Sequence, residues 1–355
     1  MGERSRMLEA HHRVIIYAEA AMNHQSSKVA EGILRYSKST VVAVIDSRHA
    51  GKRVNAVTDM DLQTPIVATL EEAAVLGADV MVLGTAPSGG RLPPEWNAVV
   101  DAALARGLSI VNGLHDALLP RFAAKLGEGQ WISDIRTPVG DFPPIAAARA
   151  SKLNNIRCAM VGTDMGVGKK SAGIEVCRAL VAMGADAEFL ATGQTGICIT
   201  GRGIPVDAFR VDHAAGAVER LVLENGQHDY LIVEGQGSLL HPGSTAVLPL
   251  IRGSCCNAMM LCHRAGMQKL DFVADVPIPP LPDVVKLYEA VASAAGALTR
   301  AKVVGIALIT RGMSDSDSRD AIKALETETG LPVQDPVRFG GFRLAAALMA
   351  LHEKP

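Results

Sequence analysis

The chain has 355 residues, of which 48% are apolar and 20% are charged, and its formal net charge is -2. This composition excludes a disordered chain, and the near-neutral charge provides no field for binding nucleic acid. No apolar run is long enough to span a membrane, and residues 1–13 lack the apolar stretch of a secretory signal. The six cysteines follow neither a disulfide framework nor a zinc spacing, so we expect a reduced, cytoplasmic protein.

Short apolar runs alternate with amphipathic stretches in the first part of the chain. The apolar runs are 14–17, 41–45, 66–67, 80–83 and 108–111. Helical patterns such as 70–76 and 95–105 lie between them. Continuous apolar strands that alternate with helices predict a parallel sheet covered on both faces. No G-x-G-x-x-G turn follows the first strand, so the pattern does not favour a nicotinamide dinucleotide site.

A proline- and glycine-rich stretch, 137–150, has the composition of a linker. A second alternating series follows it, with expected strands at 158–161, 187–191, 230–233, 258–262 and 303–309. The length also exceeds the size at which a single core usually stops growing. We therefore predict an α/β protein of two domains, residues 1–150 and 151–355, each built on a parallel sheet.

The second series opens on a run typical of a phosphate-binding loop, VGTDMGVGKKS at 161–171. Glycines let backbone N–H groups turn toward an anion, and a helix expected from Lys170 directs its positive end to the same place. Lys169 adds a positive charge. The residues predicted to hold the phosphate are Gly162, Thr163, Gly166, Val167, Gly168, Lys169, Lys170 and Ser171.

Two acidic residues lie near this loop in the expected fold. Glu234 follows the strand at 230–233, and the carboxyl ends of parallel strands form the ligand-binding edge of a sheet. There it could accept a proton or hold Mg²⁺ together with Ser171, and an acidic helix cap is the alternative. Asp164 lies inside the loop, where it could cap the next turn, contact a metal or accept a proton.

Polar residues interleaved with glycine are the predicted substrate contacts. Gln194 and Thr195 follow the strand at 187–191, and Gln236 follows Glu234. Amide and hydroxyl groups in such loops suit the recognition of a small molecule, although a plain loop is the alternative. Arg202, between two glycines, could pair with a carboxylate or phosphate, and a solvated arginine is equally consistent with the pattern.

Two histidines follow strands of the second series. His241 comes shortly after Glu234, and His263 ends the run at 258–262. Either could act as a general base, although a lone histidine is more often structural. In the first domain the loops 84–94 and 113–116 also follow strands and are further candidates for ligand contact.

Taken together, these blocks resemble a known family with an N-terminal Rossmann-like domain and a C-terminal P-loop domain, long catalogued as of unknown function. The blocks that carry the resemblance are 84–94, 113–116, 162–169, 191–196, 201–203, 233–242, 262–263 and 335–340. Members of this family have been assigned as DgcN-type D-glutamate N-acetyltransferases of D-amino-acid catabolism. The resemblance implies acetyl-CoA as donor and the amine of D-glutamate as acceptor. It also implies that Glu234 or His241 takes the proton, with Lys169 or loop amides at the oxyanion.

The longer glycine spacing of the loop also matches the G-T-D-x-x-V-G-K form of dethiobiotin synthetase. This second interpretation keeps ATP and Mg²⁺ and predicts phosphoryl transfer to a small carboxylate. A third interpretation is a nucleotide-dependent switch of the MinD kind, against which no second lysine stands near the start of the loop. In each enzyme interpretation we expect a small-molecule substrate and a homo-oligomer.

Overall fold

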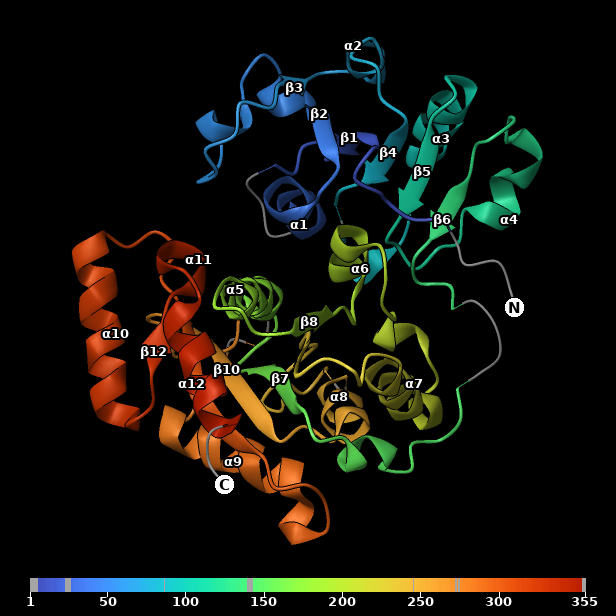
Figure 1. Cartoon of the computed structure of the whole chain (residues 1–355). Coiled ribbons are helices and arrows are strands. Elements are labelled where there is room, and N and C mark those ends of the chain that lie inside the picture. The colour runs from blue at the N-terminus through green and yellow to red at the C-terminus, as the bar shows by residue number, and fades with distance from the viewer. Residues whose placement is uncertain are drawn as a thin grey trace. The chain divides into compact units, whose positions relative to one another are not determined.

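The computed structural model describes all residues except 1–5, 23–26, 86, 139–142, 245, 272, 274 and 353–355. The chain forms two compact units. Unit 1 comprises Met1–Asp141 with Gly193–Ala208, and unit 2 comprises Phe142–Thr192 with Phe209–Pro355. Within the described residues each unit holds one parallel sheet of six strands flanked by helices (Figure 1). The predicted fold class, α/β with two parallel sheets, is confirmed.

The sheet of unit 1 has the strand order β3-β2-β1-β4-β5-β6. Its strands are β1 (Arg13–Tyr17), β2 (Thr40–Ile45), β3 (Ile66–Val67), β4 (Val80–Leu83), β5 (Ser109–Asn112) and β6 (Ile132–Asp134). This is the order of the Rossmann fold, in which ligands bind where the strand order reverses, here between β1 and β4. Strand β6 was not predicted, because three residues are too few to show a pattern.

The helices of unit 1 are α1 (Lys28–Tyr36), α2 (Leu70–Ala74), α3 (Trp96–Ala105), α4 (Leu119–Phe122) and α6 (Gln194–Thr200). Alternate strand residues such as Ile15 and Met81 form one core with the apolar sides of α2 and α3. Helix α1 lies on the other side of the sheet, and α6 packs against it (Figure 1). Gln194 therefore begins a helix, where the sequence predicted a glycine-rich loop.

The sheet of unit 2 has the order β12-β11-β10-β7-β9-β8. Its strands are β7 (Ile156–Gly162), β8 (Ala187–Leu190), β9 (Tyr230–Val233), β10 (Ala258–Arg264), β11 (Lys302–Ile309) and β12 (Val333–Gln334). Strand β7 lies between β9 and β10 and is paired in parallel with both. The loop that follows β7 is therefore placed in the middle of the carboxyl edge, beside the loops that follow β9 and β10.

Helices cover both faces of this second sheet. They are α5 (Lys169–Ala182), α7 (Val211–Glu224), α8 (Val247–Ser254), α9 (Leu281–Ser293), α10 (Asp315–Thr329), α11 (Pro336–Phe339) and α12 (Phe342–His352). Residues of α8, α9 and α10 form one core with strand residues such as Val161, Leu261 and Ile306. Helices α5 and α12 pack together and contact β7 and β11 respectively. Burying apolar side chains on both faces explains why these strands are continuous apolar runs.

Two further findings bear on the expectations from composition. All six cysteines lie in the described part of the chain and are buried thiols rather than disulfides. Burial is the largest cause of the raised pKa of Cys158, Cys256 and Cys262, because a low-dielectric interior disfavours the thiolate. Of the helices described, none is long and apolar enough to cross a membrane.

Candidate active site

The loop between β7 and α5 has the backbone geometry of an anion site. Strand β7 ends at Gly162 and α5 begins at Lys169, one residue earlier than predicted. Gly168 caps the helix with φ of 86°, a left-handed conformation that a residue with a side chain rarely adopts. Gly166 is exposed and Val167 is buried, so the loop presents its glycine backbone to solvent. Free N–H groups at a helix start favour a bound phosphate.

Lys169 lies inside this loop rather than in solvent. Its side chain is only 6% exposed, and its Nζ donates a hydrogen bond to the Asp164 carbonyl oxygen at 2.6 Å. The lysine stem passes beside Gly162 and Gly235, where a Cβ would lie 3.2 and 2.7 Å from its Cδ. The ammonium is thus held among the loop carbonyls, at the point where a phosphate would meet it.

Asp164 is fully buried, and both of its carboxylate oxygens are engaged. Oδ1 accepts the N–H of Met165 at 2.6 Å, and Oδ2 accepts the N–H of Asp271 at 2.9 Å. The first bond caps the turn of the phosphate loop, and the second ties the loop to the segment after β10. Of the three roles open from the sequence, this geometry favours the cap.

Glu234 is 2% exposed and is held at the end of β9. Its Oε2 accepts the N–H of Thr192, just beyond β8, at 2.9 Å. The Thr192 hydroxyl donates to the Glu234 carbonyl oxygen at 2.7 Å, so the two strand ends are joined twice. A Cβ on the next residue, Gly235, would lie 1.7 Å from the Met160 carbonyl oxygen. This glycine therefore lets the loop after β9 lie against the chain's own strand β7.

A buried tyrosine that the sequence did not single out joins the loop after β9 to the end of β7. The Tyr288 hydroxyl donates to the Gly162 carbonyl oxygen at 2.7 Å and accepts the N–H of Leu239 at 3.1 Å. Burial raises the pKa of Tyr288, so it is a neutral donor at neutral pH. The apolar periodicity of α9 indicates that Tyr288 is buried. It does not indicate that the partner of the hydroxyl is Gly162, 126 residues away in the sequence.

The two candidate histidines have different surroundings. His241 is 8% exposed, and its Nδ1 accepts the N–H of Gly243 at 3.1 Å. His263 pairs through Nδ1 with the hydroxyl of Thr163, in the phosphate loop, at 3.0 Å. Burial and, after it, the charge of Arg264 lower the pKa of His263 to about 4. His263 is therefore neutral at neutral pH and a weak base.

His263 also borders an open depression of about 420 Å³. Its other lining residues are Met267, Gln268, Ile278, Pro279, Pro280, Leu281 and Glu328. The lining is mostly apolar, with the imidazole among its few polar groups. Because Thr163 belongs to the phosphate loop, the hydrogen bond to His263 connects that loop to the depression.

The predicted substrate contacts fall in both units. Gln194 and Thr195 form the first turn of α6 and are partly buried, and Arg202 is exposed; all three belong to unit 1. Gln236 lies in unit 2, partly buried, directly after the Glu234–Gly235 turn. Lys170 and Ser171 are in the first turn of α5 and are also partly buried.

In unit 1 the two candidate loops, 84–94 and 113–116, are brought together. The N–H of His115 donates to the Gly90 carbonyl oxygen at 2.8 Å, and Arg91 pairs with Asp116 at 2.8 Å. Arg136 contacts the imidazole of His115, and burial together with this arginine lowers the histidine's pKa. These loops form one polar cluster at the carboxyl edge of β4 and β5.

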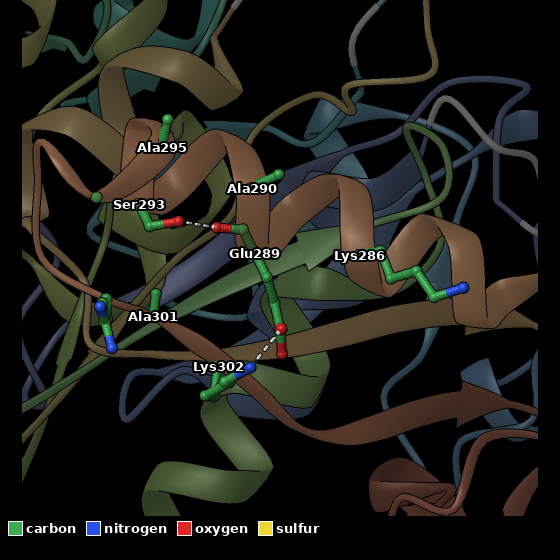
Figure 2. A pocket seen from close by; sticks show the side chains of 9 residues that line it. Lys286, Glu289, Ala290, Ser293, Ala295, Ala301 and Lys302 are labelled. Carbon is green, nitrogen blue, oxygen red and sulfur yellow. Dashed lines mark hydrogen bonds and ion pairs between the residues drawn. The ribbon is translucent and has the colours of Figure 1, made fainter.

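A larger depression, of about 490 Å³, lies elsewhere in unit 2, where α9 ends and β11 begins (Figure 2). Within it Lys302 donates to the Glu289 carboxylate at 2.8 Å, and the Ser293 hydroxyl donates to the Glu289 carbonyl oxygen at 2.6 Å. Because Lys302 is the first residue of β11, this depression is at the amino edge of the sheet. The phosphate loop is at the carboxyl edge, so the depression is separate from it.

The fold and the site define a two-domain α/β protein that combines a Rossmann-order sheet with a P-loop sheet. Residues 144–345 match the family described as a domain of unknown function, DUF1611_C P-loop domain, and residues 47–138 match its DUF1611_N Rossmann-like domain. The chain belongs to this DUF1611 family.

Characterised relatives and a solved structure extend along nearly the whole chain. A D-glutamate N-acetyltransferase of Tritonibacter scottomollicae is 33% identical over 95% of this chain and 98% of its own length. A D-glutamate N-acetyltransferase of Pseudoalteromonas sp. is 34% identical over 78% of this chain and 83% of its own. A crystal structure of a DUF1611 family protein from Anabaena variabilis, 44% identical, covers 96% of this chain and 99% of its own with a TM-score of 0.92.

Proposed function

We propose that this protein transfers the acetyl group of acetyl-CoA to the amine of D-glutamate. The observation that carries the proposal is the intact glycine loop with Lys169 inside it, in a chain whose relative over 95% of its length bears the name of that reaction. Coenzyme A carries a pyrophosphate and a further phosphate, which are the groups that such a loop binds. Consumption of D-glutamate in this way is a step of D-amino-acid catabolism.

The phosphate loop would supply binding and orientation. N–H groups around Gly166 and Gly168 surround the phosphate, and α5 adds its positive end. Lys169 now donates to the Asp164 carbonyl, and a phosphate offers it a charged acceptor and a stronger hydrogen bond. Asp164 keeps the loop in shape through its two backbone bonds.

Acetyl transfer then requires a group that takes a proton. The acceptor arrives as an ammonium ion, and its nitrogen can attack the thioester carbonyl carbon only after losing one proton. Glu234 is a carboxylate on the same edge as the loop, oriented by the Thr192 N–H. We assign the first proton to Glu234. The carbon–sulfur bond then breaks, the sulfur takes the second proton of the attacking nitrogen and leaves as the thiol of coenzyme A, and the amide forms.

A competing proposal keeps ATP and Mg²⁺ at the same loop. Ser171, in the first turn of α5 and one residue beyond the usual hydroxyl position, and Glu234, at the end of β9, would be its metal contacts. Both proposals predict phosphate binding, and they differ in which molecule is consumed. The ligand and the product therefore decide between them.

The test combines ligand stabilisation with a product assay. Thermal unfolding is followed with CoA, acetyl-CoA, ATP, and ATP with Mg²⁺, because a bound ligand raises the unfolding temperature. Thiol release and N-acetylglutamate are then measured with D- and L-glutamate. We expect stabilisation by both CoA species and turnover with the D-isomer. Stabilisation by ATP–Mg²⁺ alone, with no thiol released, would contradict acetyl transfer and favour an ATP-dependent kinase or ligase.

The acceptor contacts remain part of the proposal. Gln236 of unit 2 is assigned to the acceptor, and Gln194, Thr195 and Arg202 of unit 1 stay predictions from the sequence. Single substitutions should raise the KM for D-glutamate and leave the KM for acetyl-CoA unchanged. A cytoplasmic homo-oligomer belongs to the same proposal, and light scattering after size exclusion measures its mass.

A further inference from the structure

His241 carries a buried hydrogen-bonding atom that has no partner. Its side chain is 92% buried, and Nε2 makes no hydrogen bond to any residue that the structure describes. Buried polar atoms are almost always paired, because leaving one unpaired costs the loss of its bonds to water. An unpaired polar atom at the ligand edge of a sheet therefore points to a ligand group as its partner.

The other ring nitrogen determines what this atom can do. The N–H of Gly243 donates to His241 Nδ1 at 3.1 Å, so Nδ1 carries a lone pair and no proton. A neutral imidazole has one N–H, which must then be on Nε2. Nε2 is consequently a donor and has no lone pair to accept a proton. In this tautomer His241 cannot serve as a general base through Nε2.

The loop that holds His241 is fixed beside the phosphate loop. The Leu240 N–H donates to the Ser238 hydroxyl at 3.1 Å, and the N–H of the preceding residue, Leu239, donates to the Tyr288 hydroxyl. Tyr288 in turn donates to Gly162, where the phosphate loop begins. The His241 N–H donates to the Ser238 carbonyl oxygen at 3.3 Å, which closes a tight turn. The backbone segment that carries His241 is therefore connected to the phosphate loop by a short series of hydrogen bonds.

The chemistry of this segment selects the kind of acceptor. Residues 237–244 (GSLLHPGS) contain no charged side chain, so the segment offers no cation to a carboxylate or a phosphate. The phosphates already have the amides of the glycine loop and Lys169. A neutral N–H donor in apolar surroundings suits a neutral carbonyl oxygen that becomes negative during a reaction.

We propose that His241 donates its Nε2–H to the carbonyl oxygen of the acetyl thioester and stabilises the oxyanion of the tetrahedral intermediate. This inference rests on the proposed acetyl transfer. As the amine nitrogen bonds to the carbonyl carbon, the π electrons move onto the oxygen that Nε2–H holds. They return when the carbon–sulfur bond breaks. Of the two protons that the nitrogen loses, one goes to Glu234 and the other leaves with the sulfur as the thiol of coenzyme A. His241 is thus a donor in the reaction and not its base.

The first experiment needs no turnover. Long-range ¹H–¹⁵N correlation spectra of the ¹⁵N-labelled wild-type protein show which imidazole nitrogen carries the proton, and the His241 signals are those missing from His241→Gln. We expect the Nε2–H tautomer, with a shift of that proton on adding acetyl-CoA and no such shift with CoA. The Nδ1–H tautomer, or a shift with D-glutamate alone, would overturn the assignment.

The second experiment compares two substitutions. His241→Gln places an amide N–H where Nε2–H was, and His241→Leu leaves a side chain of similar bulk without a donor. Removing one oxyanion donor typically lowers kcat by about 100- to 1,000-fold, so we expect that loss in the leucine variant. The glutamine variant should stay within about 10-fold of wild type and keep its pH profile, because a glutamine can donate but cannot accept a proton.

Other outcomes are equally informative. Equal losses in both variants, with disappearance of the ascending limb of the pH profile, would make His241 the base. Melting curves identify a variant that fails to fold. In that case the wild-type spectra decide whether His241 carries its proton on Nε2. If the wild-type protein releases no thiol with D-glutamate, the proposed function fails. A shift of the His241 proton with acetyl-CoA would still locate the thioester beside it.

Discussion

The two units contain the same kind of sheet, and among the described residues the loop with the geometry of an anion site lies in unit 2. In unit 1 the strand order is that of a dinucleotide-binding domain, and Asp46 follows β2, where such domains place the acid that binds a ribose. Asp46 is fully buried, and both of its carboxylate oxygens already have hydrogen-bond partners. Its oxygens accept the N–H groups of Ala20, Met22 and Arg48 at 3.0 to 3.2 Å, and Nδ1 of His49 lies at 2.8 Å.

In unit 2 the corresponding loop after the central strand is arranged differently. Its acid, Asp164, binds the loop's first turn and a neighbouring segment, and Gly166 is exposed. Lys169 supplies a cation, whereas in unit 1 the loop amides are satisfied by the chain's own carboxylate. The topology places both loops at the carboxyl edge of their sheets. Which loop can bind phosphate therefore depends on whether its N–H groups are already bonded to the chain's own carboxylate.

The largest expected effect comes from Gly235→Ala, at the point where the loop after β9 touches β7. A Cβ would lie 1.7 Å from the Met160 carbonyl oxygen, and backbone cannot move aside as a flexible side chain can. Overpacking of this severity should cost more than the usual ~3 kcal/mol, and we expect little folded protein. Gly127→Ala in unit 1 is the control, because its Cβ meets only the end of Gln130. Urea unfolding measures both, and a stable Gly235→Ala variant would contradict the close packing.

Asp46→Ala tests the carboxyl edge of unit 1, where the Asp46 carboxylate binds the loop N–H groups. The substitution leaves the buried N–H of Met22 and the partly buried N–H groups of Ala20 and Arg48 without an acceptor, and we expect a loss of about 3 kcal/mol in the free energy of unfolding. The matched control is Asp101→Ala, which removes an exposed ion pair with Lys125 and should cost about 0–1 kcal/mol. The folded fraction of Asp46→Ala should bind acetyl-CoA normally. A loss of affinity for a dinucleotide relative to wild type, measured by calorimetry, would show that Asp46 serves ligands after all.

Lys169→Met tests the phosphate loop of unit 2. The variant keeps the length of the buried stem and removes the charge. Loss of a charge-assisted hydrogen bond worth about 1.5–3 kcal/mol should raise the KM for acetyl-CoA by about 10- to 100-fold. Lys302→Met, at the opposite edge of the same sheet, removes only an exposed pair with Glu289 and should leave the KM unchanged. Equal effects of the two substitutions would mean that the charge acts at long range and not in the loop.

The sequence was most informative where the determinants are local. The strand, glycines and lysine of the phosphate loop lie within 16 residues, from Ile156 to Ser171, and each has a direct physical reason to be there. The parallel sheets followed from apolar runs with a helical period between them. These features require no knowledge of which segments meet in space.

What escaped sequence reasoning depends on contacts between distant segments. Tyr288 meets Gly162 across 126 residues, and a tyrosine on the apolar side of a helix indicates burial without naming its partner. The segment Gly193–Ala208 packs with unit 1 although it follows a strand of unit 2, because the chain crosses between units twice more. The tautomer of His241 depends on a single N–H two residues away, whose direction only the backbone geometry determines.

The smallest expected effect is the pH dependence of stability that His263 gives to unit 2. His263 has its pKa lowered from 6.5 to about 4 by burial, so between these values the unfolded chain binds a proton that the folded chain does not. The stability that the neutral ring contributes is complete above pH 6.5 and is lost as the pH falls toward 4. Linkage gives a loss of roughly 1 kcal/mol between about pH 7.5 and 5.5.

His263→Asn should remove this slope, because an amide does not titrate and can still bond to the Thr163 hydroxyl. The control is His11→Asn in unit 1, whose side chain is 71% exposed. Urea unfolding at several pH values measures the free energy for all three proteins. If wild type and His263→Asn have parallel slopes, His263 is protonated in the folded protein at mildly acidic pH. The inference that this imidazole is neutral would then be wrong. A protonated His263 would add a second positive charge beside Lys169 at the phosphate loop of unit 2, whereas in unit 1 the carboxylate of Asp46 binds the loop N–H groups.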